Sequence, residues 1–204
     1  MTYLNNWYFR SVGKLTIFFN TFYYEETSPD LGNGDNNRKK YLKNFQTIKK
    51  LIENLNVIND DKLESNKIKI PVCCDEKFSL DIKRLEEKLK ISRDKIYEKF
   101  FNKEFFCYMT GFIAGMPFLG DLETELRAKR LETPRVKVPK GSVGLTEQFA
   151  NVYTFESPGG WNIIGNTPSV IFDSSKENNP NLINPGDAVT FEQITKDQYN
   201  NYNE

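Results

Sequence analysis

Glycine and proline recur between short β-rich runs from residue 111 to residue 191, and this pattern constrains the fold more than any other feature. Six segments carry it: GFIAGMPFLG at 111–120, TPR at 133–135, GSVG at 141–144, SPGGW at 157–161, GNTP at 165–168 and PGDAVTF at 185–191. Glycine permits positive φ or close backbone approach, and proline fixes φ at a value that suits turns. Such turns between β-branched and aromatic runs predict a compact β structure with individually specified loops.

The part before residue 105 mixes helical and strand patterns. Apolar residues at helical spacing predict a helix over 38–55, and Ser79 and Ser92 are predicted to cap two shorter helices. Strands are predicted at 14–19 and 67–73, and a buried strand at 105–113. These patterns predict an α+β protein, with a small α/β domain at residues 1–104 and a β domain at residues 105–204.

The charge balance and the lack of long apolar runs exclude several classes of function. Lys plus Arg and Asp plus Glu both number 28, which argues against a nucleic-acid binder, because that function depends on excess positive charge. No run of eighteen apolar residues is present, and the N-terminal residues lack a signal-peptide pattern, so no membrane attachment is expected. The three cysteines lack zinc-type spacing, and we expect reduced thiols in a cytoplasmic protein.

The chain contains no histidine, which limits the chemistry that it can perform alone. Nucleophiles activated by histidine and the usual zinc sites are both excluded. Proton transfer would have to use carboxylate, lysine, tyrosine or cysteine side chains. Asp121 and Asp187 are candidates for a general base or a metal ligand, although Asp187 after Pro185-Gly186 also fits a turn residue that bonds its own backbone.

The six segments, in this order and spacing, resemble the allophanate hydrolase subunit 1 family. This family includes the B subunit of the bacterial ATP-dependent 5-oxoprolinase and the Kip-type inhibitor of a sporulation histidine kinase. The resemblance covers residues 68–194 well. It implies a small N-terminal α/β domain, apparently shortened at its start, followed by a cyclophilin-like β-barrel from about Phe105.

The resemblance implies a B-subunit-like component of a heteromeric 5-oxoprolinase, which converts 5-oxoproline, ATP and water to glutamate, ADP and phosphate. The implied partners are a protein like the 5-oxoprolinase C subunit and an A subunit needed for activity. The chain has no GxxxxGK[ST] phosphate loop. We therefore expect ATP, with Mg, to bind in a site shared with a partner, and we expect no metal site in this chain alone.

Two segments are predicted to contact the anionic substrate. In the SPGGW segment, Ser157, Gly159 and Gly160 would present backbone N–H groups to an anion, and Trp161 would form a wall for a flat ligand. The alternative is a tight turn with Trp161 in the core. Arg135 would clamp a carboxylate or phosphate with two hydrogen bonds, and a structural ion pair is its alternative.

The remaining candidates lie in two other segments. Gly111, Phe112 and Gly115 are interpreted as a substrate loop in which Gly115 allows close ligand approach, and the alternative is a barrel crossover bent by glycine and proline. Thr167 is a further substrate-binding candidate, with a turn hydrogen bond as its alternative.

Two departures from the family pattern leave a binding function open. Many members have a histidine where Phe100 stands here and an arginine where Asn166 stands, so two titratable or charged groups are missing. These changes favour an alternative in which the chain is a non-catalytic Kip-type inhibitor that binds a sensor histidine kinase. A third hypothesis, a subunit for allophanate or urea-related amide hydrolysis, follows from the family name.

Overall fold

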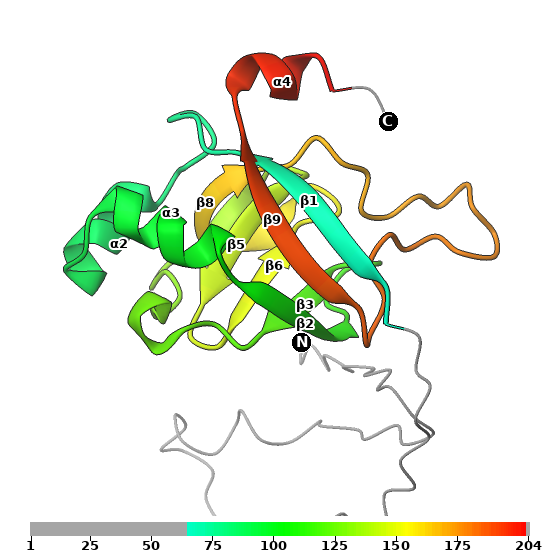
Figure 1. The fold of residues 1–204 in the computed structure, drawn as a ribbon, viewed down its shortest axis with the longest axis horizontal. Helices are drawn as coiled ribbons and strands as arrows, with labels where there is room; N and C mark the ends of the chain where they lie inside the picture. The colour runs from blue at the N-terminus through cyan, green and yellow to red at the C-terminus, as the bar shows by residue number, and fades with distance from the viewer. Residues whose placement is uncertain (1–64, 203–204) are drawn as a thin grey trace, which may run out of the picture. The chain divides into compact units, whose positions relative to one another are not determined.

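The computed structural model describes residues 65–202, and its centre is a closed barrel of seven strands (Figure 1). The strands are β1 (Lys67–Cys73), β2 (Glu104–Thr110), β3 (Pro117–Gly120), β5 (Ser142–Thr146), β6 (Phe149–Val152), β8 (Asn162–Asn166) and β9 (Ala188–Ile194). Their order around the barrel is β1-β8-β5-β6-β3-β2-β9. Only the β1–β9 pair is parallel within this described barrel. The predicted β-barrel and α+β class are confirmed.

Two short strands form a separate sheet beside the barrel. They are β4 (Arg135–Val138) and β7 (Ser157–Gly159), which pair in antiparallel register with Arg135 opposite Gly159. Both strands come from the predicted turn segments, TPR and SPGGW. The pairing therefore brings two motifs together that lie more than twenty residues apart in the sequence.

Side chains of β2 alternate between the barrel core and its outer face. Phe105 and Cys107 are fully buried, whereas Phe106 and Tyr108 are 43% and 44% exposed. This is the period-2 pattern of a strand with one face on the core. The strand predicted at 105–113 is real but ends at Thr110, where Phe112 takes a positive φ of 72°.

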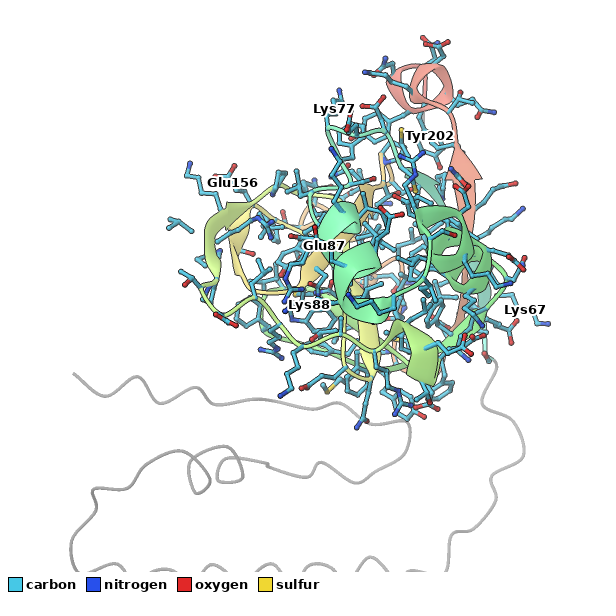
Figure 2. The ribbon with its side chains drawn as sticks, turned by 90° about the vertical axis from the view of Figure 1, so that its left-hand side faces the viewer. Lys67, Lys77, Glu87, Lys88, Glu156 and Tyr202 are labelled. Atoms are coloured by element: carbon cyan, nitrogen blue, oxygen red, sulfur yellow. The ribbon has the colours of Figure 1, made fainter. Side chains whose placement is uncertain are left out.

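Two helices contribute apolar side chains to the barrel core. They are α2 (Ile82–Leu89) and α3 (Arg93–Phe101), both predicted from apolar spacing, and Figure 2 shows Glu87 and Lys88 on the solvent side of α2. The Ser92 side chain accepts a hydrogen bond from the Lys95 N–H, so that predicted cap is confirmed. The predicted cap at Ser79 is wrong, because its hydroxyl lies 3.0 Å from the Ile164 carbonyl oxygen.

The remaining helical elements are short. A 3-10 turn, η1 (Thr124–Leu126), follows β3, and α4 (Lys196–Asn200) follows β9. Thr195 and Gln198 form a capping box at the start of α4, in which each side chain bonds the other residue's backbone N–H. None of the helices between residues 65 and 202 has the length and apolar character that crossing a membrane requires.

The barrel includes residues that precede the domain boundary predicted at 104/105. β1 closes the barrel between β8 and β9, and its parallel register joins Lys67 to Ala188. Helices α2 and α3 bury their apolar faces in the same core, so residues 65–104 pack with the barrel. The predicted strand at 14–19 and helix at 38–55 lie outside the described residues.

Candidate functional site

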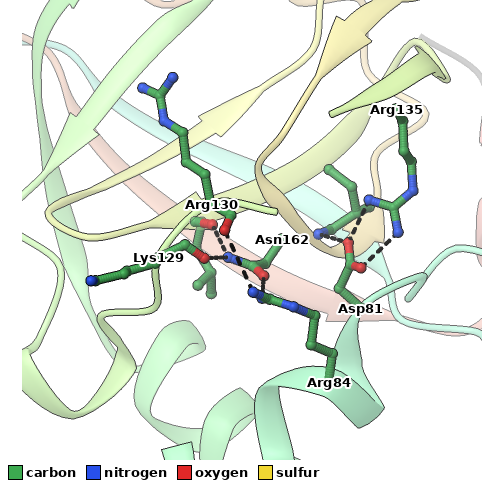
Figure 3. A network of polar contacts seen from close by, with 8 residues as sticks. Asp81, Arg84, Lys129, Arg130, Arg135 and Asn162 are labelled. Atoms are coloured by element: carbon green, nitrogen blue, oxygen red, sulfur yellow. Dashed lines mark hydrogen bonds and ion pairs between the residues drawn. The ribbon is translucent and has the colours of Figure 1, made fainter. Parts of the chain in front are cut away.

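A buried ion pair links the start of α2 to the β4–β7 sheet. Both terminal nitrogens of Arg135 bind the carboxylate of Asp81, at 3.0 and 2.6 Å (Figure 3). The same carboxylate accepts a 2.7 Å hydrogen bond from the Ile163 N–H. The Asp81 side chain is only 4% exposed, and that of Arg135 is 28% exposed. Arg135 therefore has a carboxylate partner within the chain, in the geometry that a bidentate clamp would use.

A second group of polar contacts fixes the segment that leads to β4. Asn162 donates to the carbonyl oxygens of Lys129 and Leu145, at 3.2 and 3.1 Å, and its own side-chain oxygen accepts from Arg84. Arg84 also reaches the Arg130 carbonyl oxygen at 3.5 Å. Figure 3 shows the Lys129 and Arg130 side chains pointing away from this network, so two cationic groups project from a fixed backbone.

The absence of a side chain at Gly159 in the SPGGW segment allows Tyr153 to pack closely against the backbone. A Cβ added to Gly159 would lie 2.8 Å from Cζ of Tyr153, which is closer than real Cβ atoms approach. Neither Gly159 nor Gly160 has a positive φ. The Gly160 carbonyl oxygen accepts a 2.7 Å hydrogen bond from the Leu131 N–H, which ties the turn to the fixed segment described above.

Trp161 lies in a second apolar cluster that is separate from the barrel core. It is 5% exposed and packs edge-on against Phe118, with ring centroids 5.7 Å apart. The Arg130 guanidinium lies over the Trp161 ring at 5.7 Å. Trp161 is thus buried beneath the Arg130 guanidinium. A flat ligand could contact the Trp161 ring only at the edge of this apolar cluster.

Two buried polar atoms in this region have no hydrogen-bond partner among the described residues. They are the Asn151 side-chain oxygen and the Ser157 hydroxyl. Such atoms are rare because an unsatisfied buried polar group costs about 1–3 kcal/mol. Tyr153 lies between the two in sequence, and burial raises the pKa of its hydroxyl, so this group is a neutral hydrogen-bond donor at physiological pH.

The loop after β2 packs on a different part of the chain. The Gly111 N–H donates to the Met116 carbonyl oxygen at 2.9 Å, and the Thr154 hydroxyl donates to that of Ala114 at 2.7 Å. Gly115 has a φ of 69°, and an added Cβ would lie 2.7 Å from Cβ of Phe172. The close approach at Gly115 in this structure is therefore made by Phe172, and Phe112 is half exposed on the same loop.

Comparison with known proteins identifies the family. Residues 14–183 match the family described as "Carboxyltransferase domain, subdomain C and D". The chain belongs to this family. A relative, the B subunit of 5-oxoprolinase from Bacillus subtilis (strain 168), is 33% identical over 162 residues, which cover 78% of this chain and 67% of the relative. The resemblance inferred from the six segments is confirmed.

Solved structures agree with this assignment. The conserved uncharacterized protein PH0987 from Pyrococcus horikoshii is 28% identical, with a TM-score of 0.63, and the match covers 95% of this chain and 82% of PH0987. TTHA0988 is 32% identical, with a TM-score of 0.58, over 63% of this chain. That match spans only 26% of TTHA0988, so the matched part is about a quarter of that chain.

Asn166 and Phe100, the two positions at which the resemblance led us to expect an arginine and a histidine, have structural partners. Asn166 accepts a 2.7 Å hydrogen bond from the Tyr199 hydroxyl and donates to the Lys140 carbonyl oxygen. Phe100 is fully buried, and its ring stacks on Phe191 at 4.9 Å. Neither side chain provides a charge, and both stabilise packing between elements.

Thr167 is placed apart from the other candidates of this carboxyltransferase-domain chain. Its N–H donates to the Gly141 carbonyl oxygen at 2.8 Å, and its hydroxyl accepts from the Ser169 N–H at 3.2 Å. The second is a turn hydrogen bond, and the first joins Thr167 to the residue before β5. The structure therefore brings Arg135, Gly159 and Gly160 together, with Trp161 beside them, whereas Thr167 belongs to a different turn.

Sequence patterns missed Asp81 and the contacts that it makes. An aspartate directly before a helix is typical of an N-terminal cap, and nothing local indicates a partner 54 residues away. Asp187 shows the opposite case, because its carboxylate accepts from the Asn184 N–H at 2.7 Å, as the turn interpretation predicted. Among residues 65–202, no three potential metal ligands of the His, Cys, Asp or Glu type lie together.

The thiols of Cys74 and Cys107 are predicted to be unreactive in the folded protein. Burial raises the pKa of Cys74 and that of Cys107 from 9.0 to about 12. Because only the thiolate is nucleophilic, we expect alkylation by iodoacetamide at pH 8 to be about a thousandfold slower than in the unfolded chain. Mass spectrometry of time-quenched samples measures this, and rapid labelling of Cys107 without denaturant would contradict the burial.

These raised pKa values also make the free energy of unfolding depend on pH. Above about pH 9 the thiols of the unfolded chain lose their protons, whereas those of the folded chain keep them until about pH 12. The unfolded state therefore binds fewer protons, and the free energy of unfolding falls as the pH rises from 9.

Proposed function

We propose that this chain is a B-subunit-like component of a heteromeric, ATP-dependent 5-oxoprolinase. The observation that carries the proposal is its 33% identity to the 5-oxoprolinase B subunit of Bacillus subtilis over 78% of the chain. The proposed reaction opens the lactam ring of 5-oxoproline with water and yields glutamate, ADP and phosphate. The protein would act only with other subunits, as the relative's name implies for that relative.

The region around the β4–β7 sheet has groups that suit an anionic lactam. The Tyr153 and Ser157 hydroxyls can donate hydrogen bonds, and the Asn151 side-chain oxygen can accept one from a lactam N–H. Arg130, over the Trp161 ring, supplies a positive charge near this region for the substrate carboxylate. Arg135 would position the sheet through Asp81, since its guanidinium already has a carboxylate partner.

Nucleotide binding is assigned to a site shared with a partner protein. The chain lacks a GxxxxGK[ST] loop, and residues 65–202 lack a cluster of metal ligands. A C-subunit-like protein is the proposed partner for this site, and an A-subunit-like protein is proposed to be needed for turnover. The residues of the present chain would then bind and orient 5-oxoproline.

The proposal is tested by reconstituting the complex. The chain is co-expressed with the A-subunit-like and C-subunit-like proteins of the same genome, and ADP release is measured with and without 5-oxoproline. We expect ADP release that depends on 5-oxoproline and disappears when any one protein is omitted. A well-folded complex of all three proteins that releases no ADP in response to 5-oxoproline would contradict the proposal.

The structure also gives a reason to test a binding function. Phe100 and Asn166 replace a titratable and a charged family residue with groups that serve packing and hydrogen bonding within the chain. A Kip-type inhibitor of a sensor histidine kinase needs a binding surface and no catalytic group. Inhibition of kinase autophosphorylation by the isolated chain would favour this function, and turnover of allophanate in place of 5-oxoproline would favour the urea-related alternative.

A further inference from the structure

Residues 127–131 form a basic segment between η1 and β4. Its sequence, RAKRL, carries three cationic side chains and no acidic one. Arg127 and Lys129 are exposed on either side of Ala128, which is only 6% exposed, so both side chains lie on the solvent side of the backbone. Neither forms an ion pair with a carboxylate in the part of the chain that the structure describes. The basic segment therefore carries uncompensated positive charge, although the charges of the whole chain balance.

Hydrogen bonds from other loops hold the backbone of the basic segment, which has no regular secondary structure. The Ala128 carbonyl oxygen accepts from the Glu147 N–H at 2.9 Å and from the Thr146 hydroxyl at 3.2 Å. The Leu131 N–H donates to the Gly160 carbonyl oxygen at 2.7 Å. Surface loops without such anchors open easily and change conformation. The anchors instead fix the points from which the cationic side chains project.

Arg84 of α2 and Asn162 of β8 hold the middle of the basic segment. Asn162 donates to the Lys129 carbonyl oxygen at 3.2 Å, and Arg84 reaches the next carbonyl oxygen at 3.5 Å. Figure 3 shows that the Lys129 and Arg130 side chains leave this backbone in different directions. Arg130 lies over the Trp161 ring, in the region proposed for the substrate carboxylate. Lys129 is thus a second cation close to that region, and its ammonium group forms no ion pair among residues 65–202.

On the basis of the proposed function, we infer that Arg127 and Lys129 bind the phosphate groups of ATP in the nucleotide site shared with a partner. Lysine and arginine bind phosphate oxygens through charge-assisted hydrogen bonds. Since the chain has no GxxxxGK[ST] loop, cations at separate positions have to compensate the phosphate charge. One anchored segment would then hold ATP and 5-oxoproline close together, as a reaction between them requires.

The KM for ATP of the reconstituted complex measures this role. Arg127→Gln and Lys129→Gln each remove one charge from an exposed side chain, and circular dichroism verifies that both variants are folded. We expect each to raise the KM for ATP about tenfold, the loss of one hydrogen bond between charged groups, and to leave the KM for 5-oxoproline within about twofold. Lys129→Arg keeps the charge and should stay close to the wild type.

Lys67→Gln is the matched control, because it removes the same charge from an exposed lysine at the start of β1. It should leave both KM values unchanged. An unchanged KM for ATP in a folded Lys129→Gln complex that still releases ADP in response to 5-oxoproline would overturn the phosphate site and leave the proposed function intact. Weaker binding of this variant to the C-subunit-like protein, with no change in the KM for ATP, would also overturn it and assign the cations to a protein interface.

Binding of inorganic tripolyphosphate to the complex gives a readout that does not depend on turnover. In isothermal titration calorimetry we expect binding that weakens as the salt concentration rises, and that is about tenfold weaker for Lys129→Gln. If the wild-type complex shows this binding but no response to 5-oxoproline, the proposed function is wrong and the phosphate site stands. Tripolyphosphate binding that Arg127→Gln and Lys129→Gln both leave unchanged would overturn the phosphate site, whatever the activity of the complex.

Discussion

Replacing Asp81 with alanine is expected to lower the free energy of unfolding by about 3 kcal/mol, because it breaks a buried ion pair and leaves its partners unsatisfied. The Asp81 side chain is 4% exposed and accepts three hydrogen bonds, two from Arg135 and one from the Ile163 N–H. The Ile163 N–H lies in the fully buried strand β8. The guanidinium of Arg135 is partly exposed and regains some solvation, which limits the loss.

Urea denaturation followed by fluorescence measures this effect as a shift of the unfolding midpoint. The matched control is Glu156→Ala, which removes the carboxylate of the Lys137–Glu156 pair, with side chains 74% and 55% exposed. Exposed pairs contribute about 0–1 kcal/mol, so the control should leave the midpoint almost unchanged. Equal midpoints for Asp81→Ala and Glu156→Ala would show that the buried pair does not hold α2 against the β4–β7 sheet.

A double-mutant cycle measures the interaction energy between Asp81 and Arg135 separately from their contacts with other residues. Asp81→Ala, Arg135→Met and the double variant are compared, and a coupling of about 1–3 kcal/mol is expected between the two side chains. The Arg135 variant also tests whether this residue contacts substrate at the candidate site. If Arg135 positions the sheet and does not contact substrate, Arg135→Met should lower activity of the reconstituted complex only as far as it destabilises the fold.

Local patterns were enough to predict β1, β2, α2 and α3, and the turn-rich segments predicted the β-rich class of the remainder. The strand β2 and the Ser92 cap each depend on residues a few positions apart, and both were confirmed, although one face of β2 is exposed where a buried strand was predicted. The place of β1 was not predictable in this way, because its register is set by pairing with β9, which lies more than a hundred residues later. Apolar residues in 67–73 indicate a strand, but they carry no information about which neighbour completes the sheet.

The candidate site shows the same limit. TPR and SPGGW were each recognisable as turns, and the structure joins them through the Arg135–Gly159 register. Asp81 was not recognisable as the partner of Arg135. A carboxylate before a helix can cap that helix or form an ion pair, and only the folded structure shows which it does. Gly159 was predicted for an anion turn, and its nearest neighbour is instead the Tyr153 ring, a packing constraint that no local pattern contains.

Phe100→Ala is expected to destabilise the protein by about 3–5 kcal/mol, a large part of the stability of a domain this size. Phe100 is fully buried and contacts Phe105 and Phe191, with ring centroids 5.2 and 4.9 Å away. Truncation leaves a cavity between α3 and two barrel strands that rigid rings cannot fill. The control is Phe106→Ala, the same change on the outer face of β2, where the ring is 43% exposed and the loss should stay below about 1 kcal/mol.

Phe100→His, which introduces the residue that the resemblance led us to expect at this position, distinguishes a packing position from a lost catalytic one. A buried imidazole among three aromatic rings is held neutral, whereas the unfolded chain protonates it below about pH 6.5. The unfolded state then binds more protons, so the free energy of unfolding of this variant should fall as the pH drops from 7 to 5. Urea titrations at pH 5, 6, 7 and 8 measure that slope against the wild type. A slope equal to that of the wild type would place the imidazole in contact with solvent and reopen position 100 as part of an accessible site.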